Sequence, residues 1–281
     1  MKHITVLGTG VLGSQIAYQT AFSGYDVVAY DIDDAALDAA RERFAKLAVT
    51  YSQQVAGAAG GKADDALARI RYSADLTDAV RDADLVIEAV PEALELKRDV
   101  YTKLAAVAPE HTVFATNSST LLPSALAEFT GRPAKFLALH FANQIWLHNT
   151  AEVMGTPQTD PAVFEQVVEF AASIDMVPIV IKKEKAGYLL NSLLVPLLNA
   201  AGDLLVDGIA EPDAVDKTWR IGTGAPMGPF QIFDVIGLTT AYNVSIAGGE
   251  KQQAFAKLLK EQYLDQGKLG VATGEGFYSY R

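Results

Sequence analysis

The chain of 281 residues contains no cysteine and only four histidines. Without cysteine it can form no disulfide and can use no thiolate as a nucleophile or metal ligand, and a reducing compartment is allowed. Basic residues are also scarce, because 23 Lys and Arg stand against 34 Asp and Glu, which gives a net charge of −11. No nucleic-acid partner is therefore expected, since such binding needs a basic surface.

Long uninterrupted apolar runs are scarce as well, and no basic-then-apolar leader precedes the first predicted strand. One segment, 188–206, is apolar enough to raise the question of a membrane span. Asn191, Pro196, Asn199 and Asp203 interrupt it, so a buried helix, kinked or locally broken at the proline, is the better interpretation. We expect a soluble, cytoplasmic protein without a membrane partner, and no metal site is predicted.

The first 31 residues hold the most informative pattern of the chain. A short apolar strand, 4–7, leads into Gly8-Thr9-Gly10-Val11-Leu12-Gly13, and a second strand, 27–30, ends at Asp31. The first glycine allows a tight turn, the second lets backbone approach a pyrophosphate, and the third lets the following helix pack closely on the strand. Asp31 can accept hydrogen bonds from the adenosine ribose and would repel a 2′-phosphate. We therefore predict NAD rather than NADP; the alternative is a glycine-rich turn that binds no ligand.

Apolar strand-like runs alternate with helical stretches over the first two thirds of the chain. This alternation predicts a Rossmann-type α/β domain, with a mostly parallel sheet, helices on both faces and ligands at the carboxyl ends of the strands. The predicted strands are 4–7, 27–30, 85–89, 112–115, 136–139 and 177–181, with a helix at 34–56 and a flexible break at 57–61. Polar or turn-forming groups stand at the strand ends, at Gly8, Asp31, 88–92, 117–119 and His140.

The pattern changes to helices alone after the charged stretch 182–185. We place the domain boundary at residue 184, with the NAD-binding α/β domain at 1–184 and an all-helical domain at 185–281. Leucines recur through 189–205 in a stripe wide enough to predict burial on nearly all sides, against a partner helix or subunit. Further helices are expected at 212–221, 238–247 and 251–266.

Three residues could take part in proton transfer, and each also has an ordinary structural interpretation. His140 could be the base for an alcohol at neutral pH, or a packed, hydrogen-bonded histidine. Glu152 could fix the tautomer of that histidine and stabilise its imidazolium, or be a surface carboxylate on a short strand. Ser119 could hold the substrate oxygen together with the amide of Asn191, or belong to a run, 117–120, that caps the next helix. The sequence leaves these interpretations open.

Taken together, the motifs resemble the L-3-hydroxyacyl-CoA dehydrogenase family, which includes the 3-hydroxybutyryl-CoA dehydrogenases. The resemblance covers essentially the whole chain. Besides the glycine motif, it rests on the segments 88–92, 117–119, 139–143, 151–153, 187–194, 224–230 and 273–278. It implies an NAD-dependent oxidoreductase that interconverts a short-chain (S)-3-hydroxyacyl-CoA and the 3-ketoacyl-CoA, in fatty-acid or butanoate metabolism.

The resemblance also implies roles for the matching residues. His140 would be the general base, paired with Glu152, while Ser119 and Asn191 would contact the substrate oxygen and Asn143 would help to shape the pocket. For Lys97, which would lie on the nicotinamide side, the alternative is a solvated charge on a helix face. The helical domain would form a homodimer. The residues that would contact NAD are Gly8, Thr9, Gly10, Val11, Leu12, Gly13, Asp31, Glu92, Lys97 and Asn117.

Three departures from the family pattern concern the substrate. Ala142 and Gln144 replace an aromatic ring and a proline beside the candidate base. The segment 47–54, where the family commonly carries lysines for the CoA phosphates, is uncharged, and Ala272 stands where a lysine is frequent. An acidic protein without these cations attracts CoA phosphates less strongly.

Two alternative functions follow. One is the same chemistry on a CoA-free 3-hydroxy acid or an acylcarnitine-like substrate, which the absence of a basic patch near Lys46 and Lys62 would favour. The other is a catalytically silent NAD-binding or structural protein. The presence of all four candidate residues for the chemistry argues against this second alternative.

Overall fold

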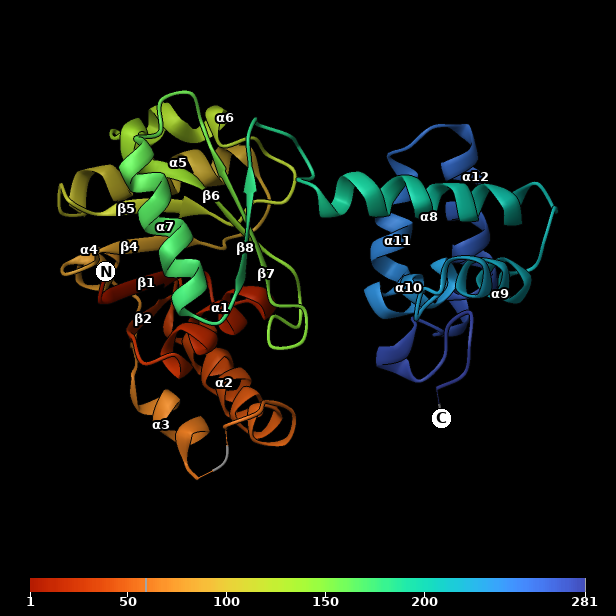
Figure 1. Ribbon diagram of the computed structural model, residues 1–281, viewed down its shortest axis with the longest axis horizontal. Coiled ribbons are helices and arrows are strands. Elements are labelled where there is room, and N and C mark those ends of the chain that lie inside the picture. Colours follow the sequence, from red (N-terminus) through yellow and green to blue (C-terminus); the bar gives the residue numbers. More distant parts are fainter. Residues whose placement is uncertain (59, 281) are drawn as a thin grey trace. The chain divides into compact units, whose positions relative to one another are not determined.

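The computed structural model describes residues 1–58 and 60–280 (Figure 1). Residue 59, in the predicted break at 57–61, and residue 281, at the end of the predicted second domain, lie outside the described residues. The chain divides into two compact units, Met1–Leu189 and Leu190–Arg281. This division lies a few residues after the boundary predicted at residue 184.

The first unit is built on one sheet, in which the described residues form eight strands in the order β3-β2-β1-β4-β5-β6-β7-β8. Neighbouring strands pair parallel except β6 and β7, which pair antiparallel. The predicted, mostly parallel sheet is thus confirmed. The strands are β1 (His3–Leu7), β2 (Asp26–Tyr30), β3 (Ile70–Ser73), β4 (Leu85–Glu88), β5 (Val113–Thr116), β6 (Phe136–Phe141), β7 (Thr150–Gly155) and β8 (Val177–Ile181).

The set of predicted strands lacks β3 and β7, although a short strand at Glu152 is part of one interpretation of that residue. β3 is a four-residue edge strand, and β7 begins with a polar residue and holds Glu152 in its interior, so neither is a continuous apolar run. β7 matters for the site because its register with β6 places Glu152 opposite His140. Residues directly opposite each other in an antiparallel pair share one face of the sheet. The pairing therefore brings these two side chains together.

Helices cover both faces of the sheet, as expected (Figure 1). On one face, α1, α2, α3 and α7 enclose a core that includes Ile16 and Val167, while α4, α5 and α6 cover the other face around Tyr101 and Leu126. α1 is buried along nearly its whole length, because the sheet lies on one side and α2 and α3 on the other. The helices of this unit are α1 (Val11–Phe22), α2 (Asp34–Gln54), α3 (Lys62–Ala68), α4 (Leu76–Val80), α5 (Leu94–Val107), α6 (Ser124–Ala127) and α7 (Pro161–Ser173), with short 3₁₀ turns at Glu128–Thr130 and Pro133–Lys135.

The second unit is all-helical, which confirms the predicted fold class. Its core is rich in aromatic rings, among them Phe230, Phe233 and Phe255. The helix α10 is absent from the prediction, and the others lie close to the predicted ranges. They are α8 (Leu190–Val206), α9 (Pro212–Thr223), α10 (Pro229–Ile236), α11 (Leu238–Ile246) and α12 (Glu250–Gln262), with 3₁₀ turns at Leu264–Gln266 and Val271–Thr273.

The leucine-rich helix α8 differs from the prediction. Pro196 lies inside it, and the helix runs past this proline without a break. Of its described residues, only Leu198, Ala201 and Gly202 are buried, and Leu193 is 75% exposed. Within the single chain, the other helices of the unit cover only one face of α8, so burial of its remaining faces against a partner subunit stays a prediction. None of the described helices combines the length and the apolar character needed to cross a membrane.

Candidate active site

The glycine motif joins β1 to α1, and two of its glycines are required sterically. Gly8 has a φ of +88°, and a Cβ there would lie 2.7 Å from the carbonyl oxygen of Ala89. A Cβ on Gly13 would lie 1.9 Å from the carbonyl oxygen of Gly8, so a side chain would push α1 away from the loop. Gly10 is exposed, and a Cβ there would meet no described atom within 4 Å. This open space at the N-terminus of α1 is a cradle that a pyrophosphate can enter.

A cavity of about 570 Å³ lies beside the glycine loop. One oxygen of Asp31 accepts hydrogen bonds from the backbone N–H and the hydroxyl of Thr9, at 2.8 and 2.6 Å, and the other accepts the N–H of Ile32 at 2.9 Å. These bonds orient the carboxylate, whose remaining lone pairs can accept ribose hydroxyls. Largely apolar walls, with the oriented carboxylate of Asp31 and the Asp99–Lys103 pair also in the lining, fit the adenosine half of NAD. The lining includes Gly8, Gly10, Asp31, Ile32, Leu76, Ala89, Val90 and Val100.

Ser119, His140 and Glu152 meet at the carboxyl-terminal edge of the sheet. Nε2 of His140 lies 3.0 Å from Oγ of Ser119, and Nδ1 lies 3.0 Å from Oε2 of Glu152. His140 and Glu152 are buried, whereas Ser119 is half-buried. Because the carboxylate accepts, Nδ1 is the nitrogen that carries a proton in the neutral ring. A histidine oriented by a carboxylate and bonded to a hydroxyl is suited to proton exchange with a substrate oxygen.

The structure contradicts two of the three ordinary structural interpretations of these residues and leaves the third open. Glu152 is not a surface carboxylate, because it is buried and its Oε1 accepts the N–H of Leu189 at 2.8 Å. The run 117–120 does not cap the next helix, since α6 begins with no side-chain cap among the described residues. His140 is packed and hydrogen-bonded in both interpretations, so its role as the base stays a prediction.

A buried ionic network supports the segment that follows β5. Nζ of Lys97 lies 2.5 Å from Oε1 of Glu88 and 3.4 Å from Oε2 of Glu92, and its side chain is 1% exposed. Oε1 of Glu92 in turn accepts the hydroxyl of Ser118 at 2.6 Å and both the N–H and the hydroxyl of Thr120 at 2.8 Å. The interpretation of Lys97 as a solvated surface charge is therefore wrong. The buried carboxylate of Glu88, at the end of β4, draws the ammonium inward.

Glu92 is held in its charged form by this network. Burial alone would raise the pKa of Glu92, but the hydrogen bonds from Ser118 and Thr120 and the charge of Lys97 outweigh burial and lower the pKa to about 2. The ionised carboxylate thereby holds the turn at 118–120 against the loop after β4. The contacts of Glu92 and Lys97 with the nicotinamide half of NAD stay predictions.

The three asparagines singled out by the sequence occupy different surroundings. Asn117 is buried, and its Oδ1 accepts the N–H of Phe141 at 3.0 Å, which joins the ends of β5 and β6. Asn143 is exposed in the loop after β6. Asn191 is the second residue of α8 and belongs to the second unit, so its contact with the substrate oxygen stays a prediction.

Sequence reasoning missed Tyr188. Its side chain is fully buried, and its ring stacks on the His140 imidazole with the ring centroids 4.2 Å apart and an angle of 11° between the planes. In the sequence it is the first residue of the apolar segment 188–206, whereas α8 begins only at Leu190. Gly187 stands directly before Tyr188, and a glycine at this point of the sequence could have been used to predict a turn instead of a helix.

Comparison with known proteins identifies the family. The model of the 3-hydroxyacyl-CoA dehydrogenase NAD-binding domain matches residues 3–185, and the model of the 3-hydroxyacyl-CoA dehydrogenase C-terminal domain matches residues 187–280. The chain belongs to the 3-hydroxyacyl-CoA dehydrogenase family. It is an NAD-dependent oxidoreductase, and the Rossmann fold and the cofactor predicted from the glycine motif are confirmed.

Relatives of several kinds cover nearly the whole chain. Human mitochondrial hydroxyacyl-coenzyme A dehydrogenase is 33% identical over 290 residues, which cover 100% of this chain and 92% of the human protein. A probable 3-hydroxybutyryl-CoA dehydrogenase from Deinococcus radiodurans is 34% identical over 284 residues, 98% of this chain and 99% of that protein. A solved structure of a diketoreductase, described by its catalysis of dicarbonyl compounds, matches this chain with 69% sequence identity and a TM-score of 0.98. The match covers 100% of this chain and 99% of the diketoreductase chain. The expected cytoplasmic location stays a prediction.

Proposed function

We propose that this enzyme interconverts a 3-hydroxyacyl group and a 3-oxoacyl group, with His140 as the general base. The observation that carries this proposal is the hydrogen-bonded chain of Ser119, His140 and Glu152, at the same edge of the sheet as the cofactor cavity. When bound, NADH supplies the hydride that adds to the carbonyl carbon, and NAD⁺ accepts that hydride in the reverse direction.

Each residue of the chain has one task in this reaction. During reduction, the imidazolium of His140 gives a proton from Nε2 to the substrate oxygen, and during oxidation the neutral imidazole takes that proton from the hydroxyl. The hydroxyl of Ser119 donates a hydrogen bond to the same oxygen and polarises the carbonyl. Glu152 holds Nδ1, so that Nε2 faces the substrate, and its charge stabilises the imidazolium. Asn191 is the proposed second donor to the substrate oxygen.

A short-chain CoA thioester is the first candidate for the substrate. Its support is the family itself, together with the human and Deinococcus relatives whose names state hydroxyacyl-CoA or hydroxybutyryl-CoA. On this candidate, the carbonyl at C3 of the acyl chain is reduced and the thioester at C1 stays intact.

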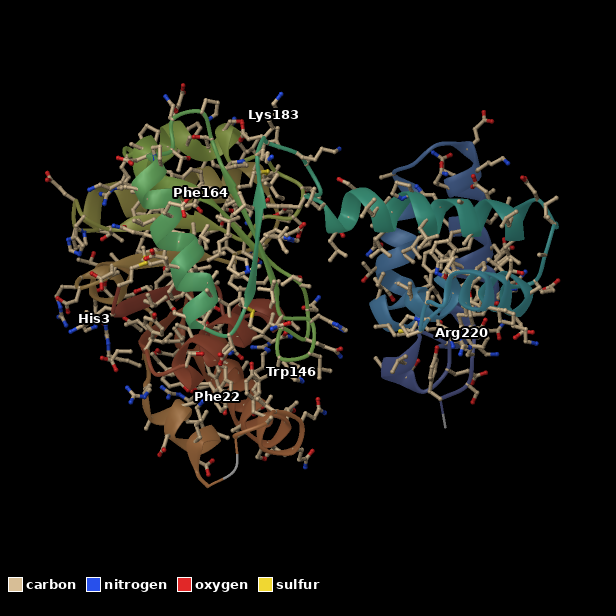
Figure 2. The ribbon with its side chains drawn as sticks, viewed as in Figure 1. His3, Phe22, Trp146, Phe164, Lys183 and Arg220 are labelled. Carbon is tan, nitrogen blue, oxygen red and sulfur yellow. The ribbon has the colours of Figure 1, made fainter. Side chains whose placement is uncertain are left out.

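A CoA-free dicarbonyl compound is the second candidate, and two observations favour it. The diketoreductase is the relative with 69% identity. In α2, the segment 47–54 carries no charge, and its exposed residues include Val49, Ser52 and Gln53. Its last residue, Gln54, accepts the indole N–H of Trp146 at 2.8 Å; Trp146 is labelled in Figure 2. At its flank, the ammonium of Lys62 lies 4.0 Å from the ring centroid of Phe22. The segment itself therefore offers no positive charge to the phosphates of CoA, and the exposed lysines at its flanks, Lys46 and Lys62, are the cations nearest to it in the sequence.

NADH oxidation with a matched substrate panel tests the function. The panel contains acetoacetyl-CoA, a medium-chain 3-oxoacyl-CoA, the corresponding free 3-oxo acids and their esters, and a saturated acyl-CoA as the control without a C3 carbonyl. We expect oxidation with 3-oxo compounds and none with the control. No oxidation with any 3-oxo compound would reject the proposal. The class with the higher kcat/KM identifies the substrate.

We also propose that the chain forms a homodimer through apolar side chains exposed on the second unit. Leu193 is 75% exposed and Ile221 is 83% exposed, and large exposed apolar side chains are typical of an interface when they form a patch. We expect dimers in size-exclusion chromatography with light scattering. A Leu193→Glu variant should shift the population toward monomer, and a wild-type monomer at micromolar concentration would contradict this assembly.

A further inference from the structure

The residue that covers the face of the His140 imidazole, Tyr188, has a strained backbone. Its φ is +52°, a region that residues with a side chain rarely adopt. Surrounding contacts hold it there: its phenol donates to the carbonyl oxygen of Ser118 at 2.7 Å, and its N–H donates to that of Lys185 at 3.0 Å. Burial, with the charges of Glu92 and other carboxylates, raises the pKa of Tyr188, so the phenol stays protonated as a donor. Strain maintained in this way is concentrated at functional sites.

The two neighbours of Tyr188 contact the other residues of the site. The N–H of Gly187 donates to the carbonyl oxygen of Ser119 at 3.2 Å, and the N–H of Leu189 donates to Oε1 of Glu152 at 2.8 Å. The segment 187–189 therefore contacts the hydroxyl-bearing residue, the histidine and the carboxylate at once. Any shift of this segment would move all three together.

We propose that Tyr188 is a positioning residue for the proton transfer, an inference that rests on His140 being the base. Its ring fixes the plane of the imidazole, so that Nε2 faces Ser119 while Nδ1 faces Glu152. The π face of the ring also stabilises the positive charge that the imidazole carries in each turnover. Its hydroxyl fixes the carbonyl of Ser118 and thereby the path of the chain into Ser119. Phenylalanine supplies the ring without the hydroxyl, and leucine supplies neither.

The test compares Tyr188→Phe and Tyr188→Leu with a matched control, Tyr51→Leu. Tyr51 is a fully buried tyrosine of the same unit, packed edge-on against Tyr18 and Phe22. For each variant, kcat, KM, the Kd of NADH from its fluorescence, and Tm are measured. We expect Tyr188→Leu to lower kcat about tenfold with KM and the NADH Kd nearly unchanged, because a stacked ring on a buried cation is worth about that factor.

The conservative variant and the control complete the comparison. Tyr188→Phe should recover kcat to within about threefold of wild type, while Tyr51→Leu should lower Tm and leave kcat nearly unchanged. If Tyr188→Leu does not fold, Tyr188→Met, which fills the space more closely, replaces it.

Three results would overturn the inference. They are a wild-type kcat in Tyr188→Leu, a Tyr188→Phe as slow as Tyr188→Leu, and a fall of kcat in Tyr51→Leu as large as that in Tyr188→Leu. Failure of the wild-type enzyme with every 3-oxo compound would instead reject the proposed function.

Discussion

Replacing Lys97 by methionine tests the buried ionic network beside the site. The variant keeps a long apolar side chain and removes the ammonium that lies 2.5 Å from Oε1 of Glu88. Among the described residues, the remaining partners of this fully buried carboxylate are neutral donors: the N–H of Val90 at 2.9 Å and the hydroxyls of Thr116 at 2.8 Å and Tyr101 at 3.3 Å. Removing one partner of a buried ion pair costs about 3–5 kcal/mol, because the other charge stays uncompensated.

We therefore expect Lys97→Met to lower the free energy of unfolding by about 3–5 kcal/mol. At about 2–4 °C per kcal/mol for a unit of this size, Tm should fall by roughly 10 °C. The double variant Lys97→Met/Glu88→Gln should recover much of this loss, because the amide removes the uncompensated charge while its oxygen still accepts a hydrogen bond from these neutral donors. Lys103→Met is the matched control on the same helix: Lys103 pairs with Asp99 at 2.7 Å but is 63% exposed, so its loss should change stability little.

Urea denaturation followed by circular dichroism at neutral pH measures these differences. Equal losses in Lys97→Met and Lys103→Met would show that burial does not make the network strong. A double variant as unstable as Lys97→Met would refute the assignment of the loss to the uncompensated charge of Glu88.

Three further predictions concern the cofactor site and its support. Asp31→Ala should weaken NADH binding about tenfold and reduce the preference for NADH over NADPH, since the ribose acceptor and the charge that repels a 2′-phosphate are lost. Fluorescence titration with both cofactors measures the preference, and an unchanged preference would contradict the role of Asp31. Gly13→Ala should abolish folding, because the new Cβ would lie 1.9 Å from the carbonyl oxygen of Gly8, whereas Gly10→Ala should fold and bind NADH more weakly. Thermal melts and NADH titration distinguish the two variants, and a stably folded Gly13→Ala would contradict the close packing of α1 on the loop. Because folding lowers the pKa of Glu92 from 4.5 to about 2, the ionised carboxylate stabilises the fold above pH 4.5, and this contribution is lost as the pH falls toward 2. On acidification, Tm should therefore fall less steeply in Glu92→Gln than in wild type. Equal slopes of Tm against pH would contradict this prediction.

The cofactor site could be predicted from the sequence because its determinants are neighbours in the chain. The turn at Gly8, the helix that starts at Val11 and the strand that ends at Asp31 lie within the first 31 residues. Each of these features depends on local backbone geometry, which a short motif encodes.

The geometry of the candidate site could not be predicted in the same way. His140 and Glu152 meet because β6 and β7 pair antiparallel in one particular register, and β7 does not stand out as a strand because Thr150 and Glu152 interrupt its apolar residues. Lys97 lies in a charged helical pattern typical of solvent exposure, and its burial depends on Glu88, which belongs to a neighbouring strand. In the sequence, Tyr188 stands at the start of an apolar segment that predicts a helix. In the structure its backbone has a positive φ, and its ring stacks on the imidazole of His140. These contacts are long-range, so no local pattern contains them.

In the proposed mechanism His140 moves the proton, while the cofactor site holds NADH independently of His140. The most direct measurement is a single-turnover experiment with His140→Gln, using bound NADH and the 3-oxo compound that wild type reduces best. We expect a wild-type Kd for NADH and a rate of NADH oxidation lowered by about 100-fold to 10,000-fold. A rate near that of the wild type would contradict the proposed mechanism.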